Sequence, residues 1–230
     1  MQIIDDIQAS HAEFTALRRD IHAHPELGFE ETRTSTLVAN KLREWGYEVT
    51  TGLGKTGVVG TLKRGNSPRS IGIRADMDAL PMQEANTFGH HSSHPSRMHA
   101  CGHDNHMAML LGAAKMLMSV KDVLSGTIYL VFQPGEEVGT GAPYMMEFGD
   151  WFEKTGAIFG AHLWCTFPSG TVGSRKGEIM AATEKFTIDI SGKQSHGSQP
   201  QLGVDAVCIA AATVMNIQAI VARHISPLDS

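Results

Sequence analysis

Apolar residues recur along much of the chain at the three-to-four-residue spacing of an amphipathic helix. In the first such stretch Ile7, Phe14 and Ile21 follow this spacing. The stretch must end just before Pro25, because the residue preceding a proline is disfavoured in helical conformation. Gly46 supplies a stop for the second stretch. The pattern predicts helices over residues 6–23, 30–45, 104–120, 141–149 and 204–222.

Between these helices lie short apolar runs of the kind that form buried or half-exposed strands. Turn residues separate them, for example Gly65 to Pro68, and a long polar loop covers residues 79–102. Strands are predicted over residues 47–51, 58–62, 71–75, 127–132 and 157–161. Because strands alternate with helices, we expect an α/β fold with a largely parallel sheet flanked by helices.

The pattern changes after Gly177. Residues 184–190 alternate as a half-exposed strand does, and the apolar helix over 204–222 follows. One strand and one helix cannot enclose a core, so we expect residues 179–230 to begin a second, α+β domain. Residues 1–178 then form the first domain, and both domains are expected to be incomplete.

The composition is that of a folded globular protein. Hydrophobic residues make up 42% and charged residues 19%, with a net charge of −5. These values exclude a disordered tail and the basic surface on which nucleic-acid binding depends. The N-terminus carries Asp5 and Asp6 and no apolar segment, unlike a secretory signal, and the three cysteines are widely spaced. Polar residues interrupt the most apolar stretch, so we expect no membrane partner. The spacing of the cysteines and the N-terminal sequence lead us to expect a cytoplasmic location.

Histidine is the feature that points to chemistry. The chain has 12 histidines, and six of them fall between residues 90 and 106. Residues able to bind metal also follow predicted strands: Asp76 and Asp78, then Glu136 and Glu137, then His162. The carboxyl ends of parallel strands share one edge of a sheet, where ligands bind in open α/β folds. The segment from Cys101 to Asp104 reaches that edge if it opens the next helix.

This donor set predicts a metal centre. A thiolate, imidazoles and a carboxylate suit Zn, Co, Ni or Mn better than Ca or Mg. If Glu137 binds metal, Glu136 lies a few ångströms away and is free to take a proton from an activated water. Asp76 and Asp78 are expected to fix the tautomers of the ligating imidazoles.

Each residue also has an ordinary interpretation. A glutamate pair in a loop is usually solvated charge, and Cys101 by itself could be an inert thiol. Asp104 is expected to act as the N-cap acceptor of its helix. His90, His91 and His94 lie among serines and a proline and are expected to be solvated. The joint placement at strand ends, and no single motif, favours a site.

Six segments, in order along the chain, carry a resemblance to a known family. The sequence resembles the M20 metallopeptidase family, in particular the amidohydrolases that include hippurate hydrolase, N-acyl-amino-acid deacylases and plant indole-acetyl-amino-acid hydrolases. The segments are HAHPELGFEE (22–31), IRADMDALP (73–81), MHACGHD (98–104), FQPGEE (132–137), GAHLW (160–164) and GKQSHG (192–197).

The resemblance implies roles for particular residues. The matches to the family's ligands for two divalent metal ions are Cys101, His103, Glu137 and His162. Glu136 matches the general base, and His196 matches a histidine that reaches the substrate. Three further residues are expected to hold the metal ligands in position without binding metal themselves: Asp76, Asp78 and Asp104.

The resemblance also assigns the two domains. Residues 1–178 would be a zinc-peptidase-like catalytic domain, and residues 179–230 the start of a lid that forms a homodimer. Family members continue beyond this point with the remaining lid, the last catalytic strands and a further histidine ligand. We therefore expect a C-terminally truncated chain, with one metal position under-coordinated and weak activity.

Three functions follow from these observations. The first is metal-dependent hydrolysis of the amide bond in small N-acyl amino acids, with Glu136 as the base. The second is a catalytically inactive module for metal binding or dimerisation. The third is hydrolysis by Cys101 as nucleophile with a nearby histidine, which gives no reason for paired glutamates at a strand end.

Overall fold

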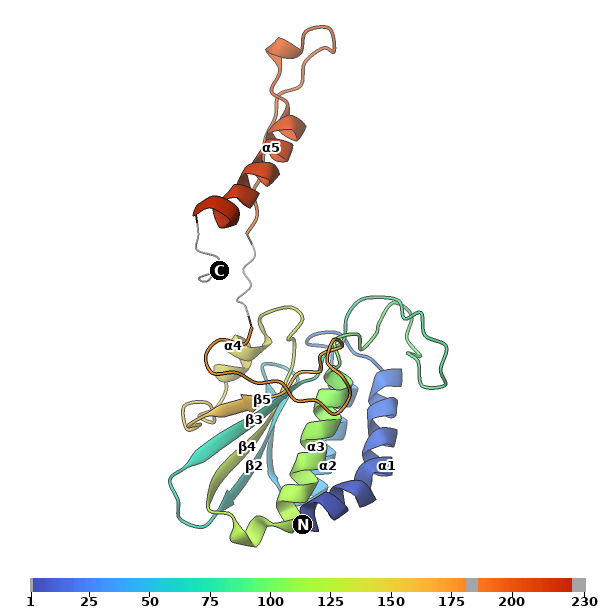
Figure 1. The fold of residues 1–230 in the computed structure, drawn as a ribbon, viewed down its shortest axis with the longest axis vertical. Helices are drawn as coiled ribbons and strands as arrows, with labels where there is room; N and C mark the ends of the chain where they lie inside the picture. Colours follow the sequence, from blue (N-terminus) through green and yellow to red (C-terminus); the bar gives the residue numbers. More distant parts are fainter. Residues whose placement is uncertain (1, 181–185, 225–230) are drawn as a thin grey trace. The chain divides into compact units, whose positions relative to one another are not determined.

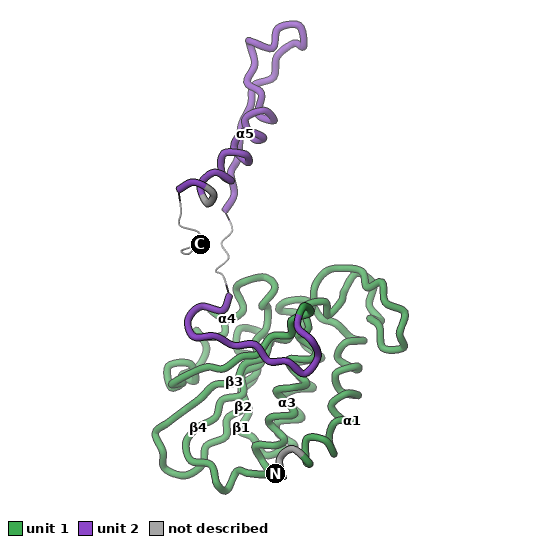
Figure 2. Tube along the Cα trace, in the orientation of Figure 1, with its two compact units in different colours: residues 1–166 green, residues 167–230 purple. Residues whose placement is uncertain are grey.

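A five-stranded sheet in the order β1-β2-β4-β3-β5 is the centre of the fold (Figure 1). The structure, a computed structural model, describes residues 2–180 and 186–224. It divides into two compact units, residues 1–166 and 167–230, which are described separately (Figure 2). The sheet lies in the first unit and consists of β1 (Glu48–Leu53), β2 (Gly57–Arg64), β3 (Ser70–Asp76), β4 (Gly126–Gln133) and β5 (Ile158–Gly160).

The sheet is mixed. β3 pairs in parallel with β4 and with β5, whereas β2 pairs antiparallel with β1 and with β4. The predicted α/β class is confirmed, but the expectation of a largely parallel sheet is wrong for the β1-β2-β4 half. Only three residues separate β1 from β2, and a connection this short joins antiparallel neighbours, since a parallel pair needs a long crossover.

Helices cover both faces of the sheet. The helices of this unit are α1 (Gln2–Ala23), α2 (Thr32–Glu44), α3 (His103–Ser119), the short 3-10 helix η1 (Lys121–Val123) and α4 (Gly141–Met146). One core lies between the sheet and α1, α2 and α3; a second, smaller one includes Met145 of α4 and Trp151. Neighbouring strand residues enter different cores, as Val58 and Val59 do, because successive side chains of a strand point to opposite faces.

The predicted elements of this unit are confirmed, with ends that shift by a few residues. α1 ends at Ala23, before Pro25. The first backbone N–H groups of α2 are not capped by the N-cap side chain. The carboxylate of Glu26 accepts those of Arg33 at 2.9 Å and Thr34 at 2.8 Å instead. Residues 79–102 form no helix or longer strand, as predicted.

Residues 167–230 form the second unit. Its main helix is α5 (Ala206–Ala219), whose N-cap Asp205 accepts the backbone N–H groups of Val207 at 2.9 Å and Cys208 at 3.0 Å. A 3-10 helix, η2 (Pro200–Leu202), precedes it and a π-helical turn, η3 (Ile220–His224), follows. The predicted helix over 204–222 is thereby confirmed.

The predicted strand over 184–190 is not found. Residues 184 and 185 lie outside the described residues, and 186–190 are not in a strand. The described part of this unit offers these residues no neighbouring strand; its one bridge joins Lys193 to Val204. The assignment of 1–178 as catalytic and 179–230 as lid stays a prediction. Among residues 2–180 and 186–224, no helix combines the length and the apolar character needed to cross a bilayer.

Candidate metal centre

Three strand ends and one helix start meet at a single edge of the sheet. Asp76 and Gln133 are register partners at the ends of β3 and β4, and Met77 donates its N–H to the carbonyl of Gln133 at 2.9 Å. The segments that carry the two aspartates and the two glutamates therefore leave the sheet side by side. β5 runs parallel to β3 and ends two residues before His162, while α3 starts at His103.

His103 lies at the centre of this edge and is fully buried. Its Nδ1–H donates to the backbone carbonyl of Asp78 at 2.7 Å, so Nε2 faces the other way. Nε2 has no hydrogen-bond partner among the described residues, yet it lies 3.5 Å from Asp76 Oδ2 and 3.8 Å from an oxygen of both Glu136 and Glu137. Burial acts to lower the pKa of His103, but the surrounding carboxylates outweigh it and raise that pKa.

Cys101 and His162 form the second part of the site. Cys101 Sγ lies 3.3 Å from His162 Nε2. The other ring nitrogen of His162 donates to the carbonyl of Leu163 at 2.6 Å, which leaves the Nε2 lone pair for the sulfur side. Burial and the charge of Glu137 raise the pKa of Cys101 to about 12. The sulfur is thus a neutral thiol until a cation stabilises the thiolate.

The paired glutamates are held by their backbone. The carboxylate of Asp78 accepts the N–H of Glu136 at 2.9 Å and that of Glu137 at 3.0 Å, and buried Glu31 accepts the N–H of Gly135 at 2.8 Å. The two side chains then differ in exposure: 41% for Glu136 and 19% for Glu137. Burial raises the pKa of Glu137, whose Oε1 is buried and has no partner in the described part of the chain.

Asp76 connects the site to α3. It accepts a hydrogen bond from His106 Nδ1 at 2.6 Å and another from Arg74 at 2.7 Å. Burial acts to raise the pKa of this carboxyl, but the His106 hydrogen bond and the Arg74 charge outweigh it and lower the pKa to about 2. Asp76 is therefore an anion that faces two histidines of α3.

Asp104 lies in a different network from the one predicted. Its carboxylate accepts from His22 Nδ1 at 2.8 Å and from Arg18 at 3.3 Å, and His22 Nε2 reaches Glu84 at 3.1 Å. The expectation that Asp104 caps α3 is wrong. The N-cap is Gly102 in a left-handed conformation, which places Asp104 within the first turn with its carboxylate toward α1.

The histidines of the loop separate into two groups. His91 and His94 are exposed, as predicted, and His90 stacks on Phe88 with ring centroids 4.1 Å apart. His99 is buried, and burial lowers its pKa to about 4, so its ring is neutral near pH 7. The predicted substrate residue His196 belongs to residues 167–230; its Nδ1 accepts the N–H of Ser198 at 3.2 Å, and its role stays a prediction.

The residues present fit a divalent cation. Each group of three potential ligands has its donor atoms within 4.8 Å of one another, and the groups are Cys101/His103/His162, Asp76/His103/His106 and His103/Glu136/Glu137. His103 Nε2 and Glu137 Oε1, both buried and without a hydrogen-bond partner among the described residues, are the atoms that a cation would satisfy. Sulfur, nitrogen and oxygen donors together suit a borderline cation such as zinc.

Sequence reasoning missed two residues that the structure ties to this site. His106 contacts Asp76 directly, and its signal was the His-x-x-His spacing that places it on the same face of α3 as His103. Glu31 holds the loop of the paired glutamates through Gly135. It stood within a recognisable segment, but nothing in its spacing pointed to a contact 104 residues away.

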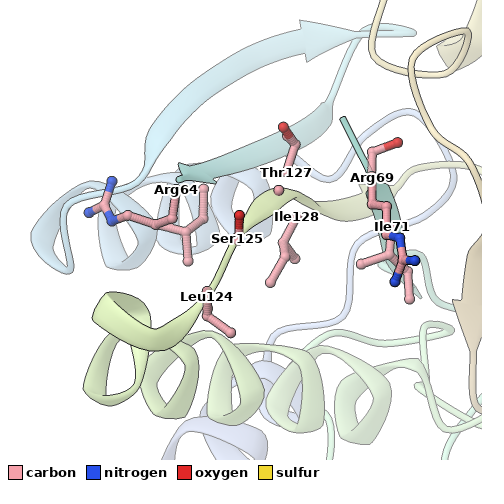
Figure 3. Close-up of a pocket in the computed structure, with 10 residues that line it drawn as sticks. Arg64, Arg69, Ile71, Leu124, Ser125, Thr127 and Ile128 are labelled. Atoms are coloured by element: carbon pink, nitrogen blue, oxygen red, sulfur yellow. The ribbon is translucent and has the colours of Figure 1, made fainter. Parts of the chain in front are cut away.

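A separate cavity lies at the opposite edge of the sheet. It has a volume of about 320 Å³ and is bounded by the amino ends of β3 and β4 (Figure 3). Arg64 and Arg69 lie at opposite ends of it, and its lining holds no histidine, cysteine or acid. It therefore has no ligand set for a metal, and the chemistry is concentrated at the other edge.

The fold and the donor set together define a class, the α/β domains with a candidate divalent-metal centre where the strands end. The chain belongs to peptidase family M20/M25/M40, whose family model matches residues 72–227. This finding confirms the resemblance that the sequence motifs indicated.

Three known proteins show how far the similarity extends. An IAA-amino acid hydrolase of Arabidopsis thaliana is 45% identical over 93% of this chain and 49% of its own. The hippurate hydrolase of Campylobacter jejuni is 44% identical over 100% of this chain and 60% of its own. A Bacillus subtilis crystal structure, described as a dinuclear metal-binding peptidase of family M20, superposes with a TM-score of 0.70 at 39% identity, covering 74% of this chain and 47% of that one. The chain thus spans about half to three fifths of these relatives.

Proposed function

We propose that this protein hydrolyses the amide bond of small N-acyl amino acids, with two divalent cations bound at the sheet edge. The observation that carries the proposal is the buried Nε2 of His103, which has no hydrogen-bond partner in the described part of the chain. It faces two glutamates, the more buried Glu137 and the more exposed Glu136. The names of the relatives support the substrate class, since hippurate and IAA-amino acids are both N-acyl amino acids.

The proposed ligands are Cys101, His103, Glu137 and His162. When bound, divalent cations would lower the pKa of water and polarise the substrate carbonyl. Backbone hydrogen bonds orient the two histidine ligands. The carbonyl of Asp78 fixes the tautomer of His103, and that of Leu163 fixes the tautomer of His162. Zn, Mn, Co and Ni all fit such a donor set.

Glu136 is the proposed general base. Its carboxylate is open to solvent while its backbone is fixed by Asp78, so it can accept a proton from the attacking water and deliver it to the leaving amine. The proposed role of His196 is to donate a hydrogen bond to the carbonyl oxygen as negative charge develops there. We also propose a homodimer formed through residues 179–230 and a cytoplasmic location, which the three free cysteines favour.

The test compares Glu136→Gln with Glu137→Gln, two neutral isosteres at adjacent positions. Glu136→Gln is expected to keep the zinc content of the wild type and to lose at least about 100-fold in hippurate hydrolysis, because general-base catalysis contributes 10²–10⁴-fold. Glu137→Gln is expected to lose bound zinc. Zinc is measured by elemental analysis and turnover by the release of glycine. Substantial turnover by Glu136→Gln would contradict the assignment.

The same measurements separate the alternatives. Bound zinc without turnover in the wild type favours the inactive metal-binding module. The 3.3 Å contact of Cys101 with His162 is also the geometry of a cysteine nucleophile with its base. Removal of metal by a chelator distinguishes a cysteine-nucleophile enzyme from the proposed metalloenzyme, because the thiol enzyme retains its turnover and the metalloenzyme does not.

A further inference from the structure

We infer that His106 is a positioning residue that holds His162 in place for metal binding and is not itself a metal ligand. The inference rests on the proposed function, in which His162 is a ligand. One potential ligand atom of each of His106, Asp76 and His103 lies within 4.8 Å of the others. By distance alone, His106 would therefore count as a third ligand of a metal site.

Both ring nitrogens of His106 are already in use. The ring is buried, and its Nε2 lies 3.0 Å from the backbone nitrogen of Leu163. A backbone N–H can only donate, so Nε2 must be the acceptor and carry no proton. The proton is then on Nδ1, which donates to Asp76 Oδ1 at 2.6 Å. No lone pair of the ring remains for a cation.

The bond to Leu163 fixes the residue next to the predicted ligand. The N–H of Leu163 donates to His106, and its carbonyl accepts from His162 Nδ1 at 2.6 Å. The rings of His106 and His162 also pack edge to face, with centroids 4.7 Å apart. Backbone and ring together direct His162 Nε2 toward Cys101 Sγ, 3.3 Å away.

His162 needs such an anchor because its own segment is weakly held. β5 has three residues, all exposed, and ends at Gly160; His162 follows in a loop and is exposed as well. His106, by contrast, stands on the 17-residue helix α3, one turn after His103. The hydrogen bond thus couples a ligand in a loop to the rigid helix that carries another ligand, and such support preorganises a metal site.

Two substitutions separate the two hydrogen bonds of His106. In His106→Gln the terminal amide oxygen reaches the position of Nε2 and can accept from Leu163, while the bond to Asp76 is lost. In His106→Asn the amide reaches the position of Nδ1 and can donate to Asp76, while Leu163 loses its acceptor. The pair is matched in polarity and differs in which contact survives.

The readout is zinc affinity, titrated on the whole protein against a chromophoric chelator. His106→Asn is expected to weaken zinc binding about 10–100-fold, the usual effect of losing a partner that orients a ligand. His106→Gln is expected to stay within about threefold of the wild type, and both variants should keep the wild-type number of zinc ions. Loss of one zinc ion in both variants, or unchanged affinity in His106→Asn, would overturn the inference.

A measurement on the wild-type protein tests the same inference if the His106 variants fail to fold. Two-bond ¹H–¹⁵N NMR spectra report which ring nitrogen of each histidine binds metal. On addition of Zn²⁺, the Nε2 signal of His162 is expected to shift while His106 keeps its proton on Nδ1 and its free-state shifts. A metal shift on His106 would overturn the inference. Absence of zinc binding by the wild type would instead overturn the proposed metal centre, on which it rests.

Discussion

At the scale of single residues, buried carboxylates hold the backbone of the paired glutamates. Asp78 accepts two consecutive backbone N–H groups and so sets the direction of both Glu136 and Glu137. The side chain of Glu136 is then the more exposed of the two and that of Glu137 the more buried. The proposed ligand and the proposed base are thus adjacent residues of one type, and a third carboxylate holds the backbone at both positions.

The loop of the paired glutamates also depends on Gly135. Its φ of +56° is unfavourable for other residues, and a Cβ there would lie 2.8 Å from the ring of Phe29. Gly135→Ala is expected to lower the free energy of unfolding by about 1–3 kcal/mol, measured by urea denaturation. Gly139→Ala is the control, since its φ is +73° but no atom of the described residues would lie within 4 Å of the added Cβ. Equal losses in both variants would show that the contact with Phe29 is immaterial.

His22 gives the protein a predictable dependence on pH. The hydrogen bond to Asp104 raises the pKa of His22 above its usual 6.5, despite the opposing effect of burial. Because the folded-state pKa is the higher one, the stabilisation is fully present below about pH 6.5 and is lost as the pH rises through the folded-state pKa. The stability difference between wild type and His22→Gln should therefore shrink on going from pH 6 to pH 8.

The check is urea unfolding of both proteins at a series of pH values. The exposed His91 supplies the control, and His91→Gln should change the free energy of unfolding only slightly. A His22→Gln difference that is constant between pH 6 and pH 8 would contradict the assigned direction of the pKa shift.

At the scale of elements, the site is a junction of the starts of α2 and α3 with the ends of β3, β4 and β5. Glu31 makes one such connection at the start of α2: its carboxylate accepts from Gly135, which follows β4, and from Thr56, which precedes β2. It is fully buried, and burial raises its pKa. One side chain thereby joins three elements whose order in the sequence says nothing about their contact.

Glu31→Ala is expected to cost about 1–3 kcal/mol of unfolding free energy, because the buried N–H of Gly135 loses its acceptor. Glu30→Ala is the neighbouring control. The side chain of Glu30 is 56% exposed and pairs with Arg97 at 2.9 Å, and such surface pairs contribute about 0–1 kcal/mol. Thermal or urea unfolding measures both. A Glu31→Ala protein as stable as Glu30→Ala would contradict this role of the carboxylate.

The sequence predicted elements better than their connections. Periodicity placed the α-helices and strands of the first unit but not the 3-10 helix η1. The position of the acids and His162 after strands predicted that they would meet. The sequence did not predict the antiparallel pairings of β2, which depend on partners distant in the chain. Nor did it predict the roles of His106 and Asp104, because a helix start shows which residues are near one another and not which way each side chain turns.

At the scale of the whole molecule, two units carry different parts of the proposed function. All proposed ligands and the proposed base lie between residues 101 and 162, within the first unit. The predicted substrate residue His196 lies in the second unit. The proposed roles in metal binding and in substrate binding can therefore be tested by separate substitutions. The match to the family covers residues 72–227 and so includes parts of both units.

The proposed site holds a divalent metal through a cysteine, histidines and a glutamate at one sheet edge. X-ray absorption spectroscopy at the zinc edge, on protein loaded with Zn²⁺, tests it most directly. We expect a sulfur ligand at about 2.3 Å together with nitrogen and oxygen ligands at about 2.0–2.2 Å, and loss of the sulfur ligand in Cys101→Ser. Bound zinc with only nitrogen and oxygen ligands in the wild type, or no bound zinc, would contradict it.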